Sequence, residues 1–183
     1  MPIMLETDSL LLRTADTAFA DKLLSYYQQN EAFLAPFEPQ REAGFYTLAA
    51  QREQLLADIA ALEQKSTVRF YIFLKEDSQP LIGSIAISNI VWGCFLSCFL
   101  GYRLDAAHRN HGYMTQAINA VIQYAFTALR LHRIEANVMP RNLPSRRVLE
   151  KCGFQAEGIS KAYLKINGVW EDHLHMVRLN DAV

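Results

Sequence analysis

The sequence predicts one α/β domain with a mixed sheet, and three observations support this. The chain has 183 residues, of which 51% are hydrophobic and 20% are charged, as in ordinary globular domains. Apolar residues recur at helical spacing in the first third of the chain, and β-rich runs dominate residues 68–104. After residue 112, helical and strand patterns alternate. Because repeats and linkers are missing from the pattern, we expect one domain over all 183 residues.

The N-terminal part predicts a short strand and two helices. Leu10–Arg13 is expected to form the strand. A helix is expected over residues 16–29, where Asp16 is a favourable N-cap residue, and a second over residues 45–64. The aromatic, proline-containing segment 33–37 is predicted as the loop between them.

The middle of the chain predicts three strands, over residues 68–75, 81–91 and 95–104. The turn-forming residues at 77–80 and 92–93 separate them.

The last third predicts a helix over residues 113–129, a strand over 132–139 and a helix over 143–152. Two further strands are expected near residues 154–164 and 170–179. This alternation favours one α/β domain with a mixed sheet.

The charges are unevenly distributed, although the net charge is only −1. Residues 1–90 carry seven Lys or Arg against twelve Asp or Glu, whereas residues 91–183 carry eleven against seven. A basic C-terminal half suits a ligand with several phosphates, and an acidic N-terminal half would attract a cationic substrate. The alternative is that the first helices simply carry a solvated acidic face. We expect no nucleic-acid partner.

Location and metal content also follow from the sequence. No apolar stretch is long enough to span a membrane, and the N-terminus lacks the pattern of a signal peptide. The three cysteines, Cys94, Cys98 and Cys152, fit neither a disulfide framework nor a zinc site. His108 and His111 have no nearby ligand cluster. We therefore expect a cytoplasmic protein without a metal or a membrane partner.

The most informative segment is Arg109–Met114, which follows a predicted strand and opens a predicted helix. Unpaired N–H groups and the helix dipole make such a junction a site for anions. Gly112 allows a tight turn and the close approach of a phosphate. The segment predicts a phosphorylated cofactor, although an ordinary turn would look similar locally.

A second element removes much of that ambiguity. Asn142 and Ser145 open another short helix, which ends before Gly153-Phe154. Together with Arg109–Met114, and with the runs at 132–137 and 163–173, this pattern resembles the GNAT family of acetyl-coenzyme A dependent N-acetyltransferases. Within that family it is similar to the RimJ/RimL branch, which acetylates N-terminal amines of ribosomal proteins.

The resemblance implies the GNAT fold, an α+β arrangement of a single mixed, mostly antiparallel sheet with splayed central strands and flanking helices. Acetyl-CoA is the implied cosubstrate, with its pantetheine arm between the splayed strands. The large side chain of Met114 must then point away from the diphosphate. The positions that match the cofactor-binding pattern are Tyr102, Arg103, Leu104, Arg109, Asn110, His111, Gly112, Tyr113, Met114, Thr115 and Asn142.

Acetyl transfer needs a neutral amine, and Glu135 is the first candidate for the base. In its predicted strand, Glu135 shares a face with Arg133 and Asn137, opposite the apolar positions. The alternative is a surface ion pair with Arg133. Asp172 and Glu171 are the next candidates.

The departing thiolate needs a proton donor. Many GNAT members place a tyrosine seven residues after the cleft asparagine, but Leu149 holds that position here. Relatives of the RimL type carry a serine three residues after the asparagine, and this chain has Ser145. We predict that Ser145 donates to the sulfur; the alternative is that it caps the helix.

The implied reaction is direct transfer, in a ternary complex, to the N-terminal amine of a ribosomal protein, with alanine as the first residue. Segment 33–37, with Glu31, Glu38 and Glu42 nearby, would face the substrate. Two alternatives stay open: acetylation of a small amine such as a polyamine or amino sugar, and a non-enzymatic role in ribosome assembly. The sequence does not decide between a monomer and a homodimer.

Overall fold

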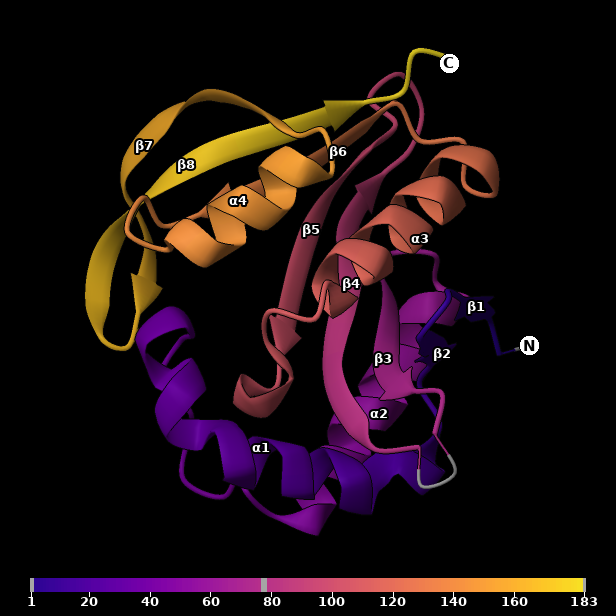
Figure 1. The fold of residues 1–183 in the computed structure, drawn as a ribbon, viewed down its shortest axis with the longest axis vertical. Coiled ribbons are helices and arrows are strands. Elements are labelled where there is room, and N and C mark those ends of the chain that lie inside the picture. Colours follow the sequence, from indigo (N-terminus) through magenta and orange to yellow (C-terminus); the bar gives the residue numbers. More distant parts are fainter. Residues whose placement is uncertain (1, 77–78, 183) are drawn as a thin grey trace.

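Within residues 2–76 and 79–182, which the computed structural model describes, eight strands form one mixed sheet (Figure 1). Their order is β1-β2-β3-β4-β5-β6-β8-β7, and all neighbours are antiparallel except the parallel pair β5–β6. The strands are β1 (Met4–Glu6), β2 (Leu10–Thr14), β3 (Val68–Leu74), β4 (Leu81–Val91), β5 (Ser97–Leu104), β6 (Arg133–Val138), β7 (Gln155–Ile166) and β8 (Val169–Leu179).

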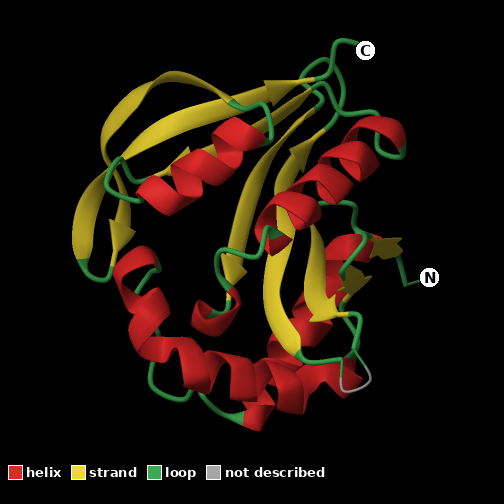
Figure 2. Cartoon of the chain, viewed as in Figure 1, coloured by secondary structure: helices red, strands yellow, loops and turns green. Residues whose placement is uncertain are grey.

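Helices cover both faces of the sheet (Figure 2). One pair, α3 and α4, lies on one face, and the other pair, α1 and α2, lies on the opposite face (Figure 1). None of the described helices is long and apolar enough to cross a membrane. The α-helices are α1 (Ala20–Leu34), α2 (Leu48–Glu63), α3 (Tyr113–Thr127) and α4 (Leu143–Lys151), and the 3-10 turns are η1 (Thr17–Phe19), η2 (Ala35–Phe37) and η3 (Ala106–His108).

Two apolar cores hold these layers together. The larger lies under α3 and α4, where Ile118 and Val121 of α3 are fully buried against Phe70 and Ile85 of the sheet. The smaller lies under α1 and α2, where Leu23 and Leu55 pack with Tyr71 and Phe73 of β3. Because β3 is buried on both faces, it anchors both helical layers.

The structure confirms the expected fold and corrects some boundaries. It adds β1, which is too short to give a clear pattern in the sequence. Asp16 accepts a hydrogen bond as the predicted cap, but it caps the 3-10 turn η1 that precedes α1. The helix α1 continues to Leu34, so segment 33–37 is the helix end and η2 rather than an open loop. The predicted turn at 77–80 lies partly outside the described residues.

Candidate active site

The parallel strands β5 and β6 separate after a short ladder. They pair only through Ser97–Phe99 and Arg133–Glu135, and their later residues diverge (Figure 1). We call the gap between residues 100–104 of β5 and 136–138 of β6 the wedge. Its apex is the last pair, Phe99 with Glu135. The prediction of splayed central strands is therefore confirmed.

The main chain at the end of β5 faces the wedge. Asp105 N–H donates to Ile82 O of β4 at 2.7 Å. Because these groups alternate in direction along an antiparallel strand, the N–H and C=O groups of Tyr102 and Leu104 point away from β4. They face the edge where β6 has already turned aside. This edge suits a ligand arm that binds like an added strand.

The side chain of Arg103 lies on the face of the sheet that α1 covers. Its guanidinium donates to Tyr27 Oη at 2.6 Å, and its Nε lies 3.1 Å from Glu38 Oε1. Burial alone would lower the pKa of Arg103, but Tyr27 and Glu38 raise it above its ordinary value. The guanidinium therefore fastens α1 and the following loop to β5. By the same alternation, the N–H and C=O groups of Arg103 face β4. Neither its main chain nor its side chain therefore faces the wedge, which does not fit the cofactor contact predicted for Arg103.

The turn before α3 has the features of an anion site. Gly112 precedes the helix with φ +78°, and no side chain among the described residues caps it. The N–H groups of Tyr113, Met114 and Thr115 therefore have no helical or capping partner in this turn. Arg109, Asn110, His111 and Gly112 are all exposed beside it. The residues present thus fit a diphosphate, and their contact with the cofactor stays a prediction.

The side chains around this turn take three directions. Met114 is 6% exposed and packs in the larger core, so it points away from the turn as expected. Tyr113 is partly buried and stacks on His111, with ring centroids 5.3 Å apart. Arg109 lies over the ring of Phe33 in α1 at 4.8 Å. The direct phosphate contacts are therefore expected from the main chain.

Replacing Gly112 with valine should weaken acetyl-CoA binding about tenfold, because a β-branched residue resists this positive φ by about 1–2 kcal/mol. Gly93 is the matched control, since it has the same φ of +78° and open space around it but lies in the β4–β5 turn. Calorimetry should show that Gly93→Val leaves the acetyl-CoA Kd unchanged. Equal Kd values for the two variants would contradict the assignment.

A pair of hydroxyl groups bridges β5 and α4 across the wedge. Tyr102 Oη lies 2.7 Å from Ser145 Oγ. Burial, the main cause, raises the pKa of Tyr102, so its phenol stays protonated near neutral pH. Asn142 is the N-cap of α4 and accepts from Ser145 N–H at 3.3 Å. The capping role thus belongs to Asn142, which leaves the Ser145 hydroxyl available for chemistry.

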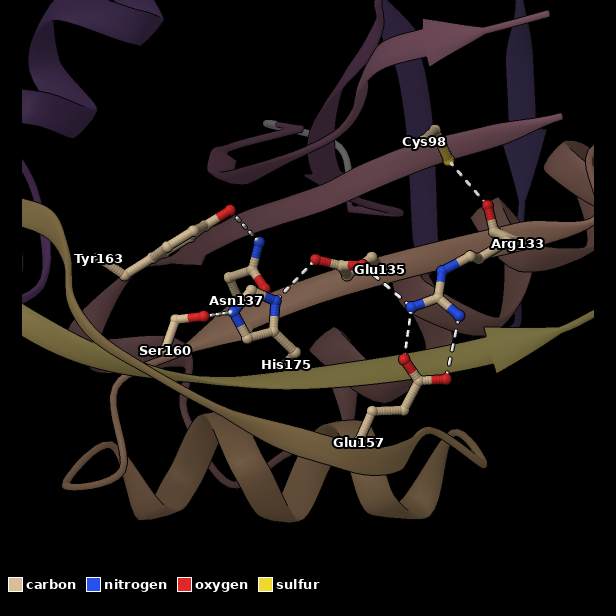
Figure 3. Close-up of polar contacts among 8 residues, drawn as sticks. All are labelled: Cys98, Arg133, Glu135, Asn137, Glu157, Ser160, Tyr163 and His175. Carbon is tan, nitrogen blue, oxygen red and sulfur yellow. Dashed lines mark hydrogen bonds and ion pairs between the residues drawn. The ribbon is translucent and has the colours of Figure 1, made fainter. Parts of the chain in front are cut away.

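Opposite α4, the sheet carries a polar network on what we call the acceptor face, the face of β6, β8 and β7 drawn in Figure 3. Glu135 Oε1 lies 2.8 Å from His175 Nδ1, and Glu135 Oε2 lies 3.1 Å from Arg133. Arg133 also binds both carboxylate oxygens of Glu157. His175 Nε2 lies 2.8 Å from Ser160 Oγ. Glu135 is therefore the centre of a network that spans three strands.

These contacts change the expected character of Glu135. Partial burial alone would raise its pKa, but the hydrogen bonds from His175 and Arg133 lower it below the ordinary value. A carboxylate with both oxygens engaged in this way is a weak proton acceptor. Glu135 lies at the wedge apex, where a base would be needed, and it also forms the ion pair with Arg133 that was the alternative. Its part in catalysis stays a prediction.

The other two candidate bases, Asp172 and Glu171, contact residues of the β7–β8 hairpin and of the loop before α4. Asp172 accepts from Ala162 N–H at 3.0 Å and from Lys161 Nζ at 2.7 Å, where β7 bulges. Glu171 binds Arg141 at 2.7 Å. Both pairs are surface contacts, and Asp172 holds the bulge rather than extending into the network of Glu135.

A cavity of about 230 Å³ lies between the end of α1 and the β7–β8 hairpin. Glu31 and Glu38 line it from one side and Asn167 from the other. The hairpin is held there by Asn167 N–H, which donates to Glu38 O at 2.9 Å. Glu38, which lines the cavity, also binds Arg103 of β5.

A family model described as an acetyltransferase (GNAT) domain matches residues 9–155. The chain belongs to the GNAT family. It is 42% identical over 177 residues to the probable N-acetyltransferase YjcK of Bacillus subtilis (strain 168), covering 97% of each chain.

Comparison with solved structures supports the same family. The ribosomal-protein-S5-alanine acetyltransferase from Vibrio fischeri has a TM-score of 0.92 and 34% identity, with 98% of this chain and 97% of that chain covered. RimJ of Mycobacterium smegmatis, solved in complex with CoA-disulfide, has a TM-score of 0.90 and 27% identity, with 100% and 88% covered. The chain is therefore an acetyl-CoA N-acetyltransferase of GNAT type, related to ribosomal-protein acetyltransferases.

Sequence reasoning missed part of this GNAT site. Tyr102 was predicted for its main chain, whereas its side chain pairs with Ser145. Ser160, Tyr163 and His175 were not singled out, although they surround Glu135 on the acceptor face (Figure 3). The alternation of strand β8 puts His173 and His175 on one face, and this was the available signal.

Proposed function

We propose that the protein acetylates the N-terminal amine of a peptide chain, with a ribosomal protein that begins with alanine as the substrate. The observation that carries the proposal is the cavity between α1 and the β7–β8 hairpin, which lies on the side of the sheet opposite α3 and α4. A peptide end entering there would meet the wedge from the side opposite the cofactor loop. The likeness to the Vibrio fischeri ribosomal-protein-S5-alanine acetyltransferase supports the same substrate class.

In this proposal, the chain holds both reactants and moves the protons. Acetyl-CoA supplies an acetyl group activated as a thioester. The main chain of Tyr102 and Leu104 binds the pantetheine arm, and the turn before α3 binds the diphosphate. Asn142 fixes the first turn of α4, so that Ser145 donates a hydrogen bond where the thiolate develops.

Direct transfer within a ternary complex fits the cysteines of the chain. A covalent relay would need a thiolate near the wedge. Burial raises the pKa of Cys152 to about 11 and that of Cys98 to about 12, so neither thiol ionises readily. Cys94 is exposed in the β4–β5 turn, at the end of β5 away from the wedge. The amine is therefore expected to attack the thioester without an acetyl-enzyme intermediate.

The choice of an α-amine also fits the weak bases on the acceptor face. An unperturbed α-amine has a pKa of about 7.8, and an unperturbed lysine amine has one of about 10.4. Deprotonation at pH 7 is therefore several kcal/mol easier for the α-amine, at about 1.4 kcal/mol per pH unit. A network without a strong carboxylate base is sufficient for such a substrate.

The direct test incubates the protein with acetyl-CoA and with peptides that begin with Ala, Ser or Met, and separately with spermidine. Thiol release and the mass of each acceptor are followed. Turnover of the Ala peptide in preference to the others is expected. Turnover of spermidine alone would favour the small-amine alternative, and binding of acetyl-CoA without any turnover would favour a non-enzymatic role.

Reversing the exposed charges Glu31 and Glu42 to lysine should raise the KM for basic peptides several-fold, because both carboxylates flank the substrate side. Glu38 is left intact because it holds Arg103. The control reverses Glu53 and Glu63, exposed carboxylates of α2. The acetyl-CoA Kd should stay constant in both double variants; a parallel change in that Kd would show that charge steering is not the cause.

A further inference from the structure

The acceptor face holds a histidine whose two ring nitrogens both have defined partners. His175 Nδ1 lies 2.8 Å from Glu135 Oε1, and its Nε2 lies 2.8 Å from Ser160 Oγ (Figure 3). Because a carboxylate only accepts hydrogen bonds, Nδ1 carries the ring proton. In the neutral ring, Nε2 is then the nitrogen without a proton, and it accepts a hydrogen bond from the Ser160 hydroxyl. The side chain of His175 is 19% exposed and that of Glu135 is 16% exposed.

The imidazole lies one strand away from the wedge. His175 of β8 is directly opposite Asn137 of β6, which borders the wedge just beyond the apex at Glu135. Adjacent strands are about 5 Å apart. Ser160 lies on β7, on the far side of β8 from β6, so a water molecule rather than the Ser160 hydroxyl would connect an amine in the wedge with the imidazole. The acceptor face therefore places the imidazole of His175 one strand away from the wedge.

Two further features support a site rather than a purely structural contact. The β7 ladder shifts register between Ser160 and Leu164, and this bulge sets Tyr163 edge-on against His175, with ring centroids 4.9 Å apart. Bulges commonly re-aim side chains beside active sites. In addition, Asn137 Oδ1 is buried and has no hydrogen-bond partner among the described residues. An acceptor amine that carries N–H donors would satisfy it.

We propose that His175 is the proton acceptor of the acetyl transfer, and that Glu135 is the positioning residue that holds its imidazole. This inference rests on the proposed function, because it assumes that the acetyl group is transferred to an amine. The ammonium group loses one proton to Nε2 through the water molecule, and the neutral nitrogen then attacks the thioester carbon. As the C–N bond forms and the C–S bond breaks, the second proton leaves the nitrogen and the thiolate is protonated. The imidazolium finally releases its proton to water.

The test compares two acceptors on the full-length protein: an Ala-initiated peptide, and the same peptide with an aminooxy group in place of the amine. An aminooxy group is neutral near pH 7 and needs no proton acceptor before it attacks. His175→Gln should lower kcat about a hundredfold for the amine, the lower end of the range for general-base catalysis, and about threefold or less for the aminooxy peptide. Glu135→Gln should show the same selectivity at about tenfold.

Glu157→Gln is the matched control, because it removes the outer partner of Arg133 and leaves the pair of Glu135 and His175 intact. It should leave both kcat values unchanged. An equal loss with both acceptors, or no loss in His175→Gln, would overturn the role of His175. If the wild type acetylates only spermidine, the peptide assignment fails, and the comparison is repeated with spermidine and its aminooxy counterpart. No turnover with any acceptor would overturn both proposals.

Discussion

Replacing Ser145 with alanine is expected to lower kcat about a thousandfold, the upper range for removing one donor that stabilises developing charge. In the proposed reaction the thiolate forms beside the first turn of α4, where Tyr102 Oη lies 2.7 Å from the Ser145 hydroxyl. Because Tyr102 is buried and stays protonated, Ser145 keeps a hydrogen-bonded partner throughout the reaction. Steady-state kinetics with acetyl-CoA and an Ala-initiated peptide measure the effect.

Ser145→Thr is the control for this change, because it keeps the hydroxyl at the same position of α4. It should retain most of the activity, and Tyr102→Phe should fall between the two. The Kd for acetyl-CoA should change little in all three variants. If Ser145→Ala and Ser145→Thr have the same kcat, the hydroxyl has no part in the departure of the thiolate.

The largest loss of stability is expected for Arg103→Met, at about 3 kcal/mol, the lower limit for breaking a buried ion pair. The guanidinium binds Tyr27 Oη and Glu38, and it lies over the Tyr27 ring at 5.7 Å. With a side chain 22% exposed, Arg103 is largely shielded from water. The loss should appear in the free energy of unfolding measured with urea.

Arg41 provides the comparison, because it binds the same Glu38, whereas only Arg103 also donates to Tyr27 Oη of α1. Arg41→Met should lower the free energy of unfolding by about 1 kcal/mol or less, as for other partly exposed pairs. Arg103→Met should also raise the KM for peptide, because α1 and the cavity wall lose their attachment to β5. Equal stability losses in the two variants would contradict this account of α1.

The parts of the structure that follow local rules were predictable. The turn before α3 needs a residue that tolerates positive φ, and Gly112 supplies it. The face of β6 follows from strict alternation, so Glu135 and Asn137 were expected on the side opposite the apolar residues. These features depend on a few consecutive residues, which the sequence displays directly.

The parts that depend on distant residues were not predictable. The partner of Ser145 is Tyr102, 43 positions earlier, and no local spacing links them. His175 reaches Glu135 only because β8 lies between β6 and β7, a strand order that periodicity does not encode. The position of Asp172 depends on the β7 bulge, which the sequence does not display as a break in the strand.

The central claim is that acetyl-CoA in the wedge meets a peptide amine that arrives from the acceptor face. A crystal structure with a bisubstrate analogue, in which CoA is joined through its acetyl group to the amine of an alanyl peptide, tests it most directly. We expect the pantetheine arm beside Tyr102 and Leu104, the diphosphate at the turn before α3, and the peptide in the cavity next to Asn167. A pantetheine arm outside the wedge, or a peptide on the side of α3 and α4, would contradict the account.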